Sequence, residues 1–366
     1  MEAVEKPKFA VIGAGHGGLA MAGHLSLMGF QVNLFNRSEE RLWGVKTTGG
    51  IRIESDFGLN GFGKVNIATT NIEEAISDVD IIMVVVPATA HRYIAEISAP
   101  YLKDGQIIIL NPGRTFGALE FRQVLNSLNV TKDVIIAEAQ TFIYASRAMN
   151  PGQVRIFRIK NSIPLASIRA YLIPEVIKRI RVAYPQFVPG DNIFKTSFDN
   201  IGAVFHPSLC VLNAGWIEDD EEFEFYYQGV TQSVAKVLEQ VDYERVKVAE
   251  ALGIRSITAR EWLYLAYSAV GNNLYESMKA NPGYRGIKAP NRLNMRYITE
   301  DVPTSLVPIA SVGKKFGVET PTINSIIHLA SILTQTDYWQ QGRTVEKLNI
   351  KDMSLKQLRL LAIGEK

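Results

Sequence analysis

A glycine-rich segment near the beginning of the chain has a spacing that can bind a phosphate-containing cofactor. Residues 13–18 are Gly-Ala-Gly-His-Gly-Gly, which fits the pattern G-x-G-x-x-G. Gly13 would permit a tight turn, Gly15 would let the backbone approach a pyrophosphate, and Gly18 would allow close packing of a helix on a strand. The free N–H groups and partial positive charge of a helix N-terminus would then face the phosphates. Because glycines collect in many loops, this prediction depends on the elements around the motif.

Those elements have the order that dinucleotide binding requires. The apolar run Phe9–Ile12 predicts a strand directly before the glycines. Gly17–Met28 places apolar residues on one helical face and is followed by Gly29, a residue that commonly ends a helix. Gln31–Phe35 predicts a second strand. A strand, a glycine loop, a helix and a second strand make the βαβ unit of a dinucleotide-binding domain, with His16 of the loop also expected at the cofactor.

The end of the second strand bears on which dinucleotide is bound. Folds that prefer NAD usually place Asp or Glu there to bind the ribose hydroxyls. This chain has Asn36 and Arg37 instead: Asn36 would not repel a 2′-phosphate, and Arg37 could pair with it. We therefore expect NADP(H) to be favoured over NAD(H). In the alternative interpretation, Arg37 is only a solvated loop cation. Pro87, which follows a later apolar run, is also expected at the cofactor site.

The remaining pattern predicts an α/β fold with an N-terminal Rossmann doubly wound parallel sheet and a mostly α-helical C-terminal domain. Short apolar runs alternate with helical spacing, as in parallel sheets covered on both faces. Further strands are expected at Ile81–Val86, Gln106–Leu110 and Val134–Ala137, with a helix from Thr89 and an antiparallel strand at Gln153–Ile159.

Beyond Pro189–Gly190 the composition becomes helical. Helices are expected at Tyr226–Leu252, Thr258–Asn273, Ser305–Phe316 and Thr322–Leu333. We therefore assign residues 1–190 to an NAD(P)-binding Rossmann domain and residues 191–366 to a helical substrate or catalytic domain.

Composition excludes several other classes of protein. A chain of 366 residues exceeds what a single hydrophobic core usually spans, and 47% hydrophobic with 21% charged residues is typical of globular proteins. The net charge of +2, without a Lys/Arg block, gives no footprint for nucleic acid. Cys210 is the only cysteine, and the five histidines lack HExxH spacing, so neither an intramolecular disulfide nor a protein metal site is expected. No signal peptide or membrane span is recognised, which makes the cytoplasm the expected location.

Four later segments carry a family resemblance. They are Asn111–Ala118 (NPGRTFGA), Glu138–Arg147 (EAQTFIYASR), Asn200–Pro207 (NIGAVFHP) and Arg296–Pro303 (RYITEDVP). Together with the glycine loop they resemble the octopine/nopaline (opine) dehydrogenase family. They fall in both predicted domains, so the resemblance covers nearly the whole chain. The layout is similar, more distantly, to ketopantoate reductase and glycerol-3-phosphate dehydrogenase.

The resemblance implies a reductive condensation in which a keto acid and the amine of an amino acid form an imine that the nicotinamide reduces. It implies that His206 and Asp301 form a catalytic pair and that Arg296 holds the keto-acid carboxylate. Thr141 and Arg114 are implied as further substrate contacts. These residue types suit the chemistry, because histidine titrates near neutrality, a carboxylate fixes its tautomer and arginine binds carboxylates bidentately.

Other interpretations remain open at this stage. His206 could be a packed structural histidine, and Asp301 could cap a helix. The chain could also be a reductase of a simple 2-keto or 3-hydroxy acid on the same scaffold. Such relatives usually employ a catalytic lysine in the helical domain, whereas this chain offers His206 in a His-Pro pair before its long helices. A non-catalytic NADP(H)-sensing protein is a third hypothesis. A homodimer is the candidate assembly.

Overall fold

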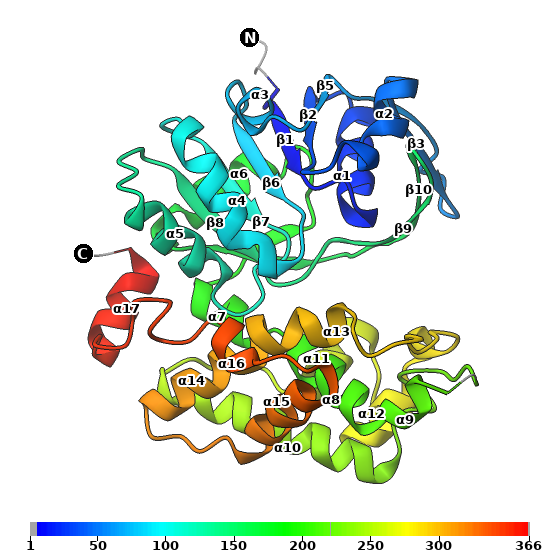
Figure 1. Cartoon of the computed structure of the whole chain (residues 1–366), viewed down its shortest axis with the longest axis vertical. Helices are drawn as coiled ribbons and strands as arrows, with labels where there is room; N and C mark the ends of the chain where they lie inside the picture. Colours follow the sequence, from blue (N-terminus) through cyan, green and yellow to red (C-terminus); the bar gives the residue numbers. More distant parts are fainter. Residues whose placement is uncertain (1–5, 220, 365–366) are drawn as a thin grey trace. The chain divides into compact units, whose positions relative to one another are not determined.

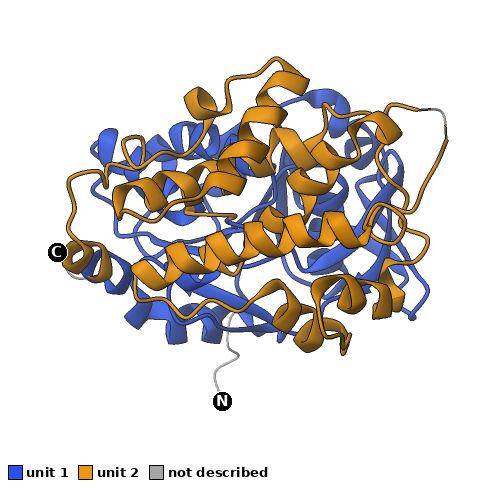
Figure 2. Cartoon of the chain, turned by 90° about the horizontal axis from the view of Figure 1, so that it is seen from below, with its two compact units in different colours: residues 1–113, 117–196, 360–366 blue, residues 114–116, 197–359 orange. Residues whose placement is uncertain are grey.

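The computed structural model describes residues 6–219 and 221–364, and the chain divides into two compact units (Figures 1 and 2). The sheet unit comprises residues 1–113, 117–196 and 360–366, and the helical unit comprises residues 114–116 and 197–359. The division falls after Thr196 instead of at Gly190. The intervening residues belong to the sheet unit because Gly190 N donates to Leu165 O (2.9 Å) and Thr196 Oγ1 donates to Glu138 Oε1 (2.7 Å).

The main sheet has the strand order of a dinucleotide-binding fold. In spatial order, its eight strands within the described residues are β12 (Phe187–Pro189), β11 (Ile163–Ser167), β8 (Ile135–Ala139), β7 (Ile107–Leu110), β6 (Ile81–Val84), β1 (Phe9–Ile12), β2 (Val32–Phe35) and β5 (Ile67–Thr69). The strands from β5 to β8 are parallel, and β11 is antiparallel to β8. Every residue of β1, β6 and β7 is apolar and buried, as expected for strands covered on both faces. The predicted Rossmann sheet is confirmed.

A second, smaller sheet in this unit was not predicted. In spatial order, its strands are β4 (Gly61–Lys64), β3 (Gly50–Ser55), β10 (Gln153–Ile159) and β9 (Tyr144–Asn150). The strand Gln153–Ile159, predicted as an antiparallel addition to the other strands, is β10 of this separate sheet, where it is antiparallel to β9 and parallel to β3. Helix α1 (His16–Leu27) contacts β1 and β2 of the main sheet and all four strands of the small one (Figure 1). The small sheet thus buries the face of the glycine-loop helix that would otherwise be solvated.

The other helices of the sheet unit are short. They are α2 (Trp43–Thr48), α3 (Ile72–Ile76), α4 (His91–Ser98), α5 (Gly117–Ser127) and α6 (Ile173–Ile180), while α7 (Ile193–Phe198) and α17 (Leu355–Ile363) continue from one unit into the other.

The helical unit is built around one long helix, α10. Its elements are α8 (Gly202–Leu212), α9 (Ala214–Ile217), α10 (Gln232–Ala251), α11 (Ala259–Tyr267), α12 (Leu274–Ala280), α13 (Arg296–Thr299), a π-helical turn (Val302–Leu306), α14 (Val307–Lys315), α15 (Pro321–Thr334) and α16 (Tyr338–Gln341). Helix α10 contacts α8, α12, α14 and α15.

Two predicted helices have different ends. The helix expected from Tyr226 begins at Gln232, because Thr231 caps it by accepting a hydrogen bond from Val234 N (3.3 Å). The helix expected to reach Asn273 ends at Tyr267, because Ser268 adopts a left-handed backbone conformation (φ 55°).

Candidate active site

The glycine loop has the geometry that a bound pyrophosphate requires. Gly13 has a φ of +114°, and a Cβ added there would lie 2.4 Å from Val85 O. A Cβ at Gly18 would lie 1.7 Å from Gly13 O, so only glycine fits either position. A Cβ at Gly15 would meet nothing within 4 Å, which leaves the backbone open on that side. These residues therefore fit a dinucleotide, whose phosphates would approach at Gly15 and at the N-terminus of α1.

The two other residues expected near the loop lie close to it in the sheet unit. His16 is the first residue of α1, and its Nδ1 accepts a hydrogen bond from Ala148 N (2.9 Å). Pro87 is exposed just beyond the end of β6. Val85 N, at the same strand end, donates to Ile12 O (2.8 Å). Both predicted residues thus lie by the carboxyl ends of β1 and β6, where open α/β sheets bind ligands.

The end of β2 carries a polar side chain that is part of the loop. Asn36 Oδ1 accepts a hydrogen bond from Ala14 N (3.0 Å), and its Nδ2 donates to Ser38 O (3.0 Å). The next residue, Arg37, lines a cavity of about 420 Å³. The other residues around this cavity are Phe35, Thr70, Asn71, Ile72, Tyr93 and Ile97.

Thr141 lies in the sheet unit, in the connection between β8 and β9. Its Oγ1 is 2.6 Å from Lys160 Nζ, which donates to it. The Thr141 hydroxyl can still donate its own proton. Lys160, which the sequence did not single out, follows directly after β10.

In the helical unit, His206 and Asp301 form a close pair. His206 lies in the middle of α8, and its Nδ1 is 2.8 Å from Asp301 Oδ2. The Asp301 side chain is 0% exposed, whereas that of His206 is 19% exposed. The Tyr297 ring stacks on the imidazole with a centroid separation of 4.2 Å and an interplanar angle of 16°. A Cβ at Gly202 would lie 3.3 Å from His206 Cε1, so a small residue is favoured one turn earlier.

Arg114 joins this pair from a distant part of the sequence. Its Nη1 is 3.1 Å from Asp301 Oδ1, and its Nε donates to Glu300 Oε1 (3.3 Å). Arg114 and Phe116 both have positive φ angles, 58° and 62°, which are unfavourable for side chains of this kind. Thr115 N donates to the carbonyl oxygen of Thr304 (3.1 Å), which helps to hold this segment.

These charges determine the ionisation of the buried aspartate. Burial by itself raises the pKa of Asp301, but the attractions of Arg114, His206 and Arg296 outweigh it and place this pKa below its usual range. Burial lowers the pKa of Arg114, and the two carboxylates of Asp301 and Glu300 more than reverse that effect. Asp301 therefore remains a carboxylate beside the imidazole.

Arg296 and Glu300 form a second pair in the same cluster. Arg296 Nε donates to Glu300 Oε2 (2.9 Å), and Arg296 Nη2 lies 2.8 Å from the same oxygen. The Arg296 side chain is 56% exposed, whereas Glu300 is 1% exposed. The structure thus brings together four predicted residues, His206, Asp301, Arg296 and Arg114, and adds Glu300. In the sequence, the pair of Arg296 and Glu300 could have been predicted from their spacing of one helical turn.

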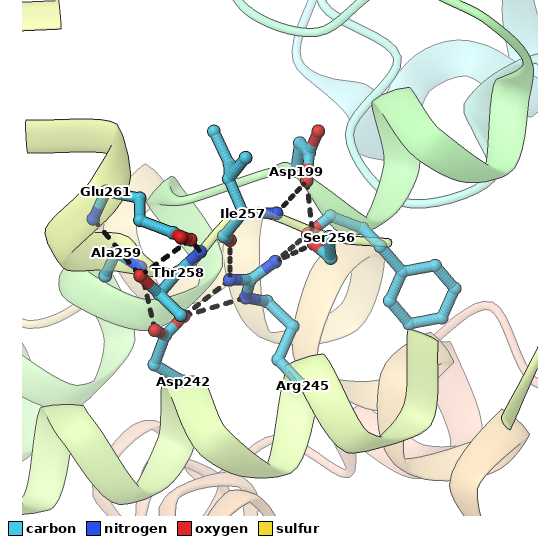
Figure 3. Close-up of polar contacts among 9 residues, drawn as sticks. Asp199, Asp242, Arg245, Ser256, Ile257, Thr258, Ala259 and Glu261 are labelled. Atoms are coloured by element: carbon cyan, nitrogen blue, oxygen red, sulfur yellow. Dashed lines mark hydrogen bonds and ion pairs between the residues drawn. The ribbon is translucent and has the colours of Figure 1, made fainter. Parts of the chain in front are cut away.

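A buried arginine anchors the segment that leads into α8. Arg245 of α10 donates to Phe198 O, and its Nη2 lies 2.6 Å from Asp242 Oδ1 (Figure 3). Asp199 Oδ1 accepts hydrogen bonds from Ser256 Oγ (2.7 Å) and Ile257 N (3.0 Å). The side chains of this network belong to helix α10 and to the chain on either side of it, so they fix residues 198–199 from several directions.

The same anchoring extends toward Asp301. Asn200, the next residue in the chain, donates from Nδ2 to Ser305 Oγ (2.9 Å), which lies in the π-helical turn directly after Asp301. The beginning of α8 and the segment carrying Asp301 are therefore joined by a buried hydrogen bond. This connection constrains the distance between His206 and its carboxylate partner.

Neither a cluster of metal ligands nor a membrane-spanning helix is found within the described residues. Among residues 6–219 and 221–364, no group of three or more His, Cys, Asp or Glu side chains is placed to hold a metal ion. Within the same residues, no helix has both the length and the apolar character needed to cross a membrane.

Comparison with known proteins identifies the family. Residues 189–334 match the family model described as NAD/NADP octopine/nopaline dehydrogenase, alpha-helical domain, and residues 8–116 match that of the NAD binding domain of 6-phosphogluconate dehydrogenase. An opine dehydrogenase from Arthrobacter sp. (strain 1C) is 37% identical over 356 residues, which cover 97% of this chain and 99% of that protein. The chain belongs to the opine dehydrogenase family.

Solved structures extend the likeness in fold across the whole chain. An octopine dehydrogenase structure with NADH and L-arginine has a TM-score of 0.82 at 21% identity and covers 99% of both chains. A yersinopine dehydrogenase structure with NADP+ bound has a TM-score of 0.77 at 16% identity and covers 98% of both. As a member of the opine dehydrogenase family, this chain is an NAD(P)-dependent oxidoreductase, and its glycine loop lies within residues 8–116, which match an NAD binding domain.

Proposed function

We propose that this enzyme catalyses the reductive condensation of a 2-keto acid with the amine of an amino acid, and the reverse oxidation, with His206 and Asp301 as its acid/base pair. The observation that carries the proposal is the 2.8 Å contact between His206 Nδ1 and the fully buried Asp301 carboxylate. Solved octopine dehydrogenase complexes contain L-arginine or pyruvate with NADH, which supports the two substrate classes.

His206 would move the protons of the reaction. With Nδ1 donating to Asp301, its Nε2 can accept a proton from the substrate ammonium group, which frees the amine to attack the keto carbon, and can later donate a proton to the hydroxyl group that leaves as water. The negative Asp301 stabilises the imidazolium formed in between and holds the ring in one tautomer. When bound, the reduced nicotinamide supplies the hydride that is added to the imine carbon. In the oxidative direction, His206 takes a proton from the water that adds to the imine and returns a proton to the departing amine.

Arg296 would bind the keto-acid carboxylate. A guanidinium remains charged and presents paired N–H donors, which match the two oxygens of a carboxylate. The exposed side chain of Arg296 is accessible to a ligand, and Glu300 engages only one edge of its guanidinium. Thr141, with its hydroxyl proton available, is proposed as a further substrate contact. Arg114 would contact substrate through Nη2, because its Nε and Nη1 are engaged by Glu300 and Asp301.

We also propose that NADPH is preferred over NADH. The position at the end of β2 that is acidic in NAD-preferring folds is Asn36, whose side-chain oxygen is already bonded to Ala14 N. Arg37 follows it and lines the neighbouring cavity, where it could pair with a 2′-phosphate. A cytoplasmic location and a homodimer stay predictions from the sequence.

The reaction type is tested by analysing products. Purified enzyme is incubated with NADPH and a panel of keto acids, with and without amino acids, and the products are read by mass spectrometry. We expect a secondary-amine dicarboxylate only when both substrates are present. A hydroxy acid formed at full rate without an amine would show instead a 2-keto-acid reductase.

A further inference from the structure

Glu300 is a buried carboxylate that joins two arginines of different character. Its Oε2 is bonded to Arg296 Nε and Nη2 (2.9 and 2.8 Å), and its Oε1 accepts a hydrogen bond from Arg114 Nε (3.3 Å). Arg296 is largely exposed, whereas only 11% of the Arg114 side chain is exposed. Burying a carboxylate without a partner costs free energy, because the charge loses its hydration. Glu300 is therefore expected to keep each of these contacts in the folded protein.

These contacts limit the freedom of Arg296. A long side chain that is more than half exposed would otherwise sample many rotamers, and ordering it on binding would cost conformational entropy. Glu300 holds the edge formed by Nε and Nη2 and so fixes the plane of the guanidinium. In the part of the chain that the structure describes, the hydrogen bond and ion pair of the Arg296 guanidinium are made by Nε and Nη2, and none is made by Nη1. The unengaged end of the guanidinium is therefore presented in a fixed orientation.

Glu300 is in turn held by the interior of the unit. Arg114 fixes Oε1 from its buried position and also contacts Asp301, the partner of His206. The side chains of Arg296, Glu300, Arg114 and Asp301 thus form a continuous chain of charge-assisted contacts. Through it, the exposed arginine and the acid/base pair share one rigid support.

We propose that Glu300 is a positioning residue that fixes the Arg296 guanidinium to receive the carboxylate of the keto-acid substrate. This inference rests on the proposed function, in which Arg296 binds that carboxylate. Glutamate suits the role better than its closest analogues. Aspartate is one methylene shorter and cannot keep both arginine contacts, whereas glutamine has one acceptor oxygen where two are used.

The test uses the holoenzyme and oxamate, an unreactive mimic of a 2-keto acid. Oxamate affinity is measured by calorimetry on cofactor-saturated wild type, Glu300→Gln, Glu300→Asp, Arg296→Gln and the Arg296→Gln/Glu300→Gln double variant, and KM and kcat are measured with the best keto acid. Glu319→Gln is the matched control, because Glu319 is an exposed glutamate of the same unit without a hydrogen bond or ion pair among the described residues.

We expect Glu300→Gln to weaken oxamate binding and raise the keto-acid KM by about tenfold to a hundredfold, the size typical of a misplaced binding group, with a smaller fall in kcat. Glu300→Asp should recover part of the loss, and cofactor affinity should not change. In the Arg296→Gln background, Glu300→Gln should add nothing, because it acts through Arg296.

Two results would overturn the inference. One is oxamate affinity in Glu300→Gln equal to wild type. The other is a loss of affinity from Glu300→Gln that is equally large with Arg296 already removed, which would mean a general structural effect. If Glu300→Gln does not fold, Glu300→Asp in both backgrounds decides by the same criterion. Failure of the proposed function is seen separately, as a wild-type enzyme that binds oxamate through Arg296 yet forms no secondary amine.

Discussion

Asp301 is a carboxylate that stays ionised although it is fully buried. Burial disfavours its charge, and nearby cations reverse that preference, with Arg114 the strongest and His206 and Arg296 adding to it. An ionised Asp301 is what the imidazole requires, because only the anion can accept the Nδ1 proton and stabilise the imidazolium. Arg114, distant in sequence, thus acts on His206 through the charge of the residue between them.

The first prediction concerns the acid limit of activity. Replacing Arg114 with glutamine removes the strongest attraction, so the pKa of Asp301 should rise and the acid limb of the kcat/KM profile should move toward neutral pH. Arg114→Lys keeps the charge and should shift the limb less. Steady-state assays across pH 4–8 measure both variants against wild type. Superimposable acid limbs in wild type and Arg114→Gln would contradict this account of Asp301.

The ion pair between Arg114 and Asp301 also makes the stability of the fold depend on pH. Because the folded pKa of Asp301 is lowered, its ionisation stabilises the fold above the unfolded pKa, and this contribution is lost as pH falls through the folded value. Removing one member of a buried ion pair typically costs roughly 3–5 kcal/mol. We therefore expect Arg114→Gln to unfold at lower urea concentration than wild type at pH 7. The difference should shrink on acidification.

The sequence predicted those residues of the candidate site that lie in specific motifs. His206, Asp301, Arg296 and Arg114 came from three separate segments, and the structure collects them in one cluster. Glu300 lies inside one of those motifs but was given no role. An acid one turn after an arginine usually indicates a solvated surface pair, and its burial depends on Arg114, whose position a linear sequence does not reveal.

The end of strand β2 positions the two residues that are proposed to distinguish NADPH from NADH. Strand β2 ends at Phe35, and the chain turns so that Asn36 binds back to the glycine loop while Arg37 reaches the cavity beyond it. A parallel sheet presents several loops at this edge, and a cation at the end of β2 lies where the adenosine ribose of a dinucleotide is bound.

The element-scale prediction is a measurable cofactor preference. A charge-assisted contact contributes roughly 1.5–3 kcal/mol, so NADPH should bind on the order of tenfold to a hundredfold tighter than NADH. Arg37→Gln should remove most of this difference by weakening NADPH alone. Calorimetric titration of both cofactors into both proteins measures it. Equal affinity for the two cofactors in wild type would contradict the role given to Arg37.

Helices and strands could be predicted from the sequence where the local pattern of apolar residues is enough to determine the structure. The strands β1, β6 and β7 are short, continuous apolar runs, and their predicted limits agree with the structure to within about two residues. The small sheet was missed because its strands mix charged and apolar residues, and β3 pairs with β10 from a distant part of the chain. The beginning of α10 was misplaced because apolar residues before Thr231 continue a helical spacing without being helical.

At the scale of the whole chain, cofactor binding and acid/base chemistry are proposed for residues of different units. The residues proposed for the cofactor all belong to the sheet unit, from Gly13 to Pro87. The pair proposed for acid/base chemistry and the arginine proposed to bind the keto-acid carboxylate belong to the helical unit. Each unit has its own core, with strands such as β1 and β7 fully buried in one and helices such as α8 and α14 largely buried in the other. A substitution of the acid/base pair should therefore leave cofactor affinity unchanged, and a substitution at the cofactor site should leave the acid/base step unchanged.

His206→Ala tests this separation. It removes the proton carrier, so kcat should fall by roughly a hundredfold or more. NADPH affinity should not change, because every residue proposed to bind the cofactor remains. A ligand that binds only the native state stabilises it by RT ln(1 + [L]/Kd), about 2.7 kcal/mol at a concentration of 100 Kd, so NADPH should stabilise wild type and His206→Ala equally in thermal unfolding.

The converse variant, Arg37→Gln, should lose part of that stabilisation while keeping its kcat at saturating cofactor. A fully active His206→Ala enzyme would exclude the acid/base assignment, and one that no longer responds to NADPH would show that the two units do not divide the work in this way.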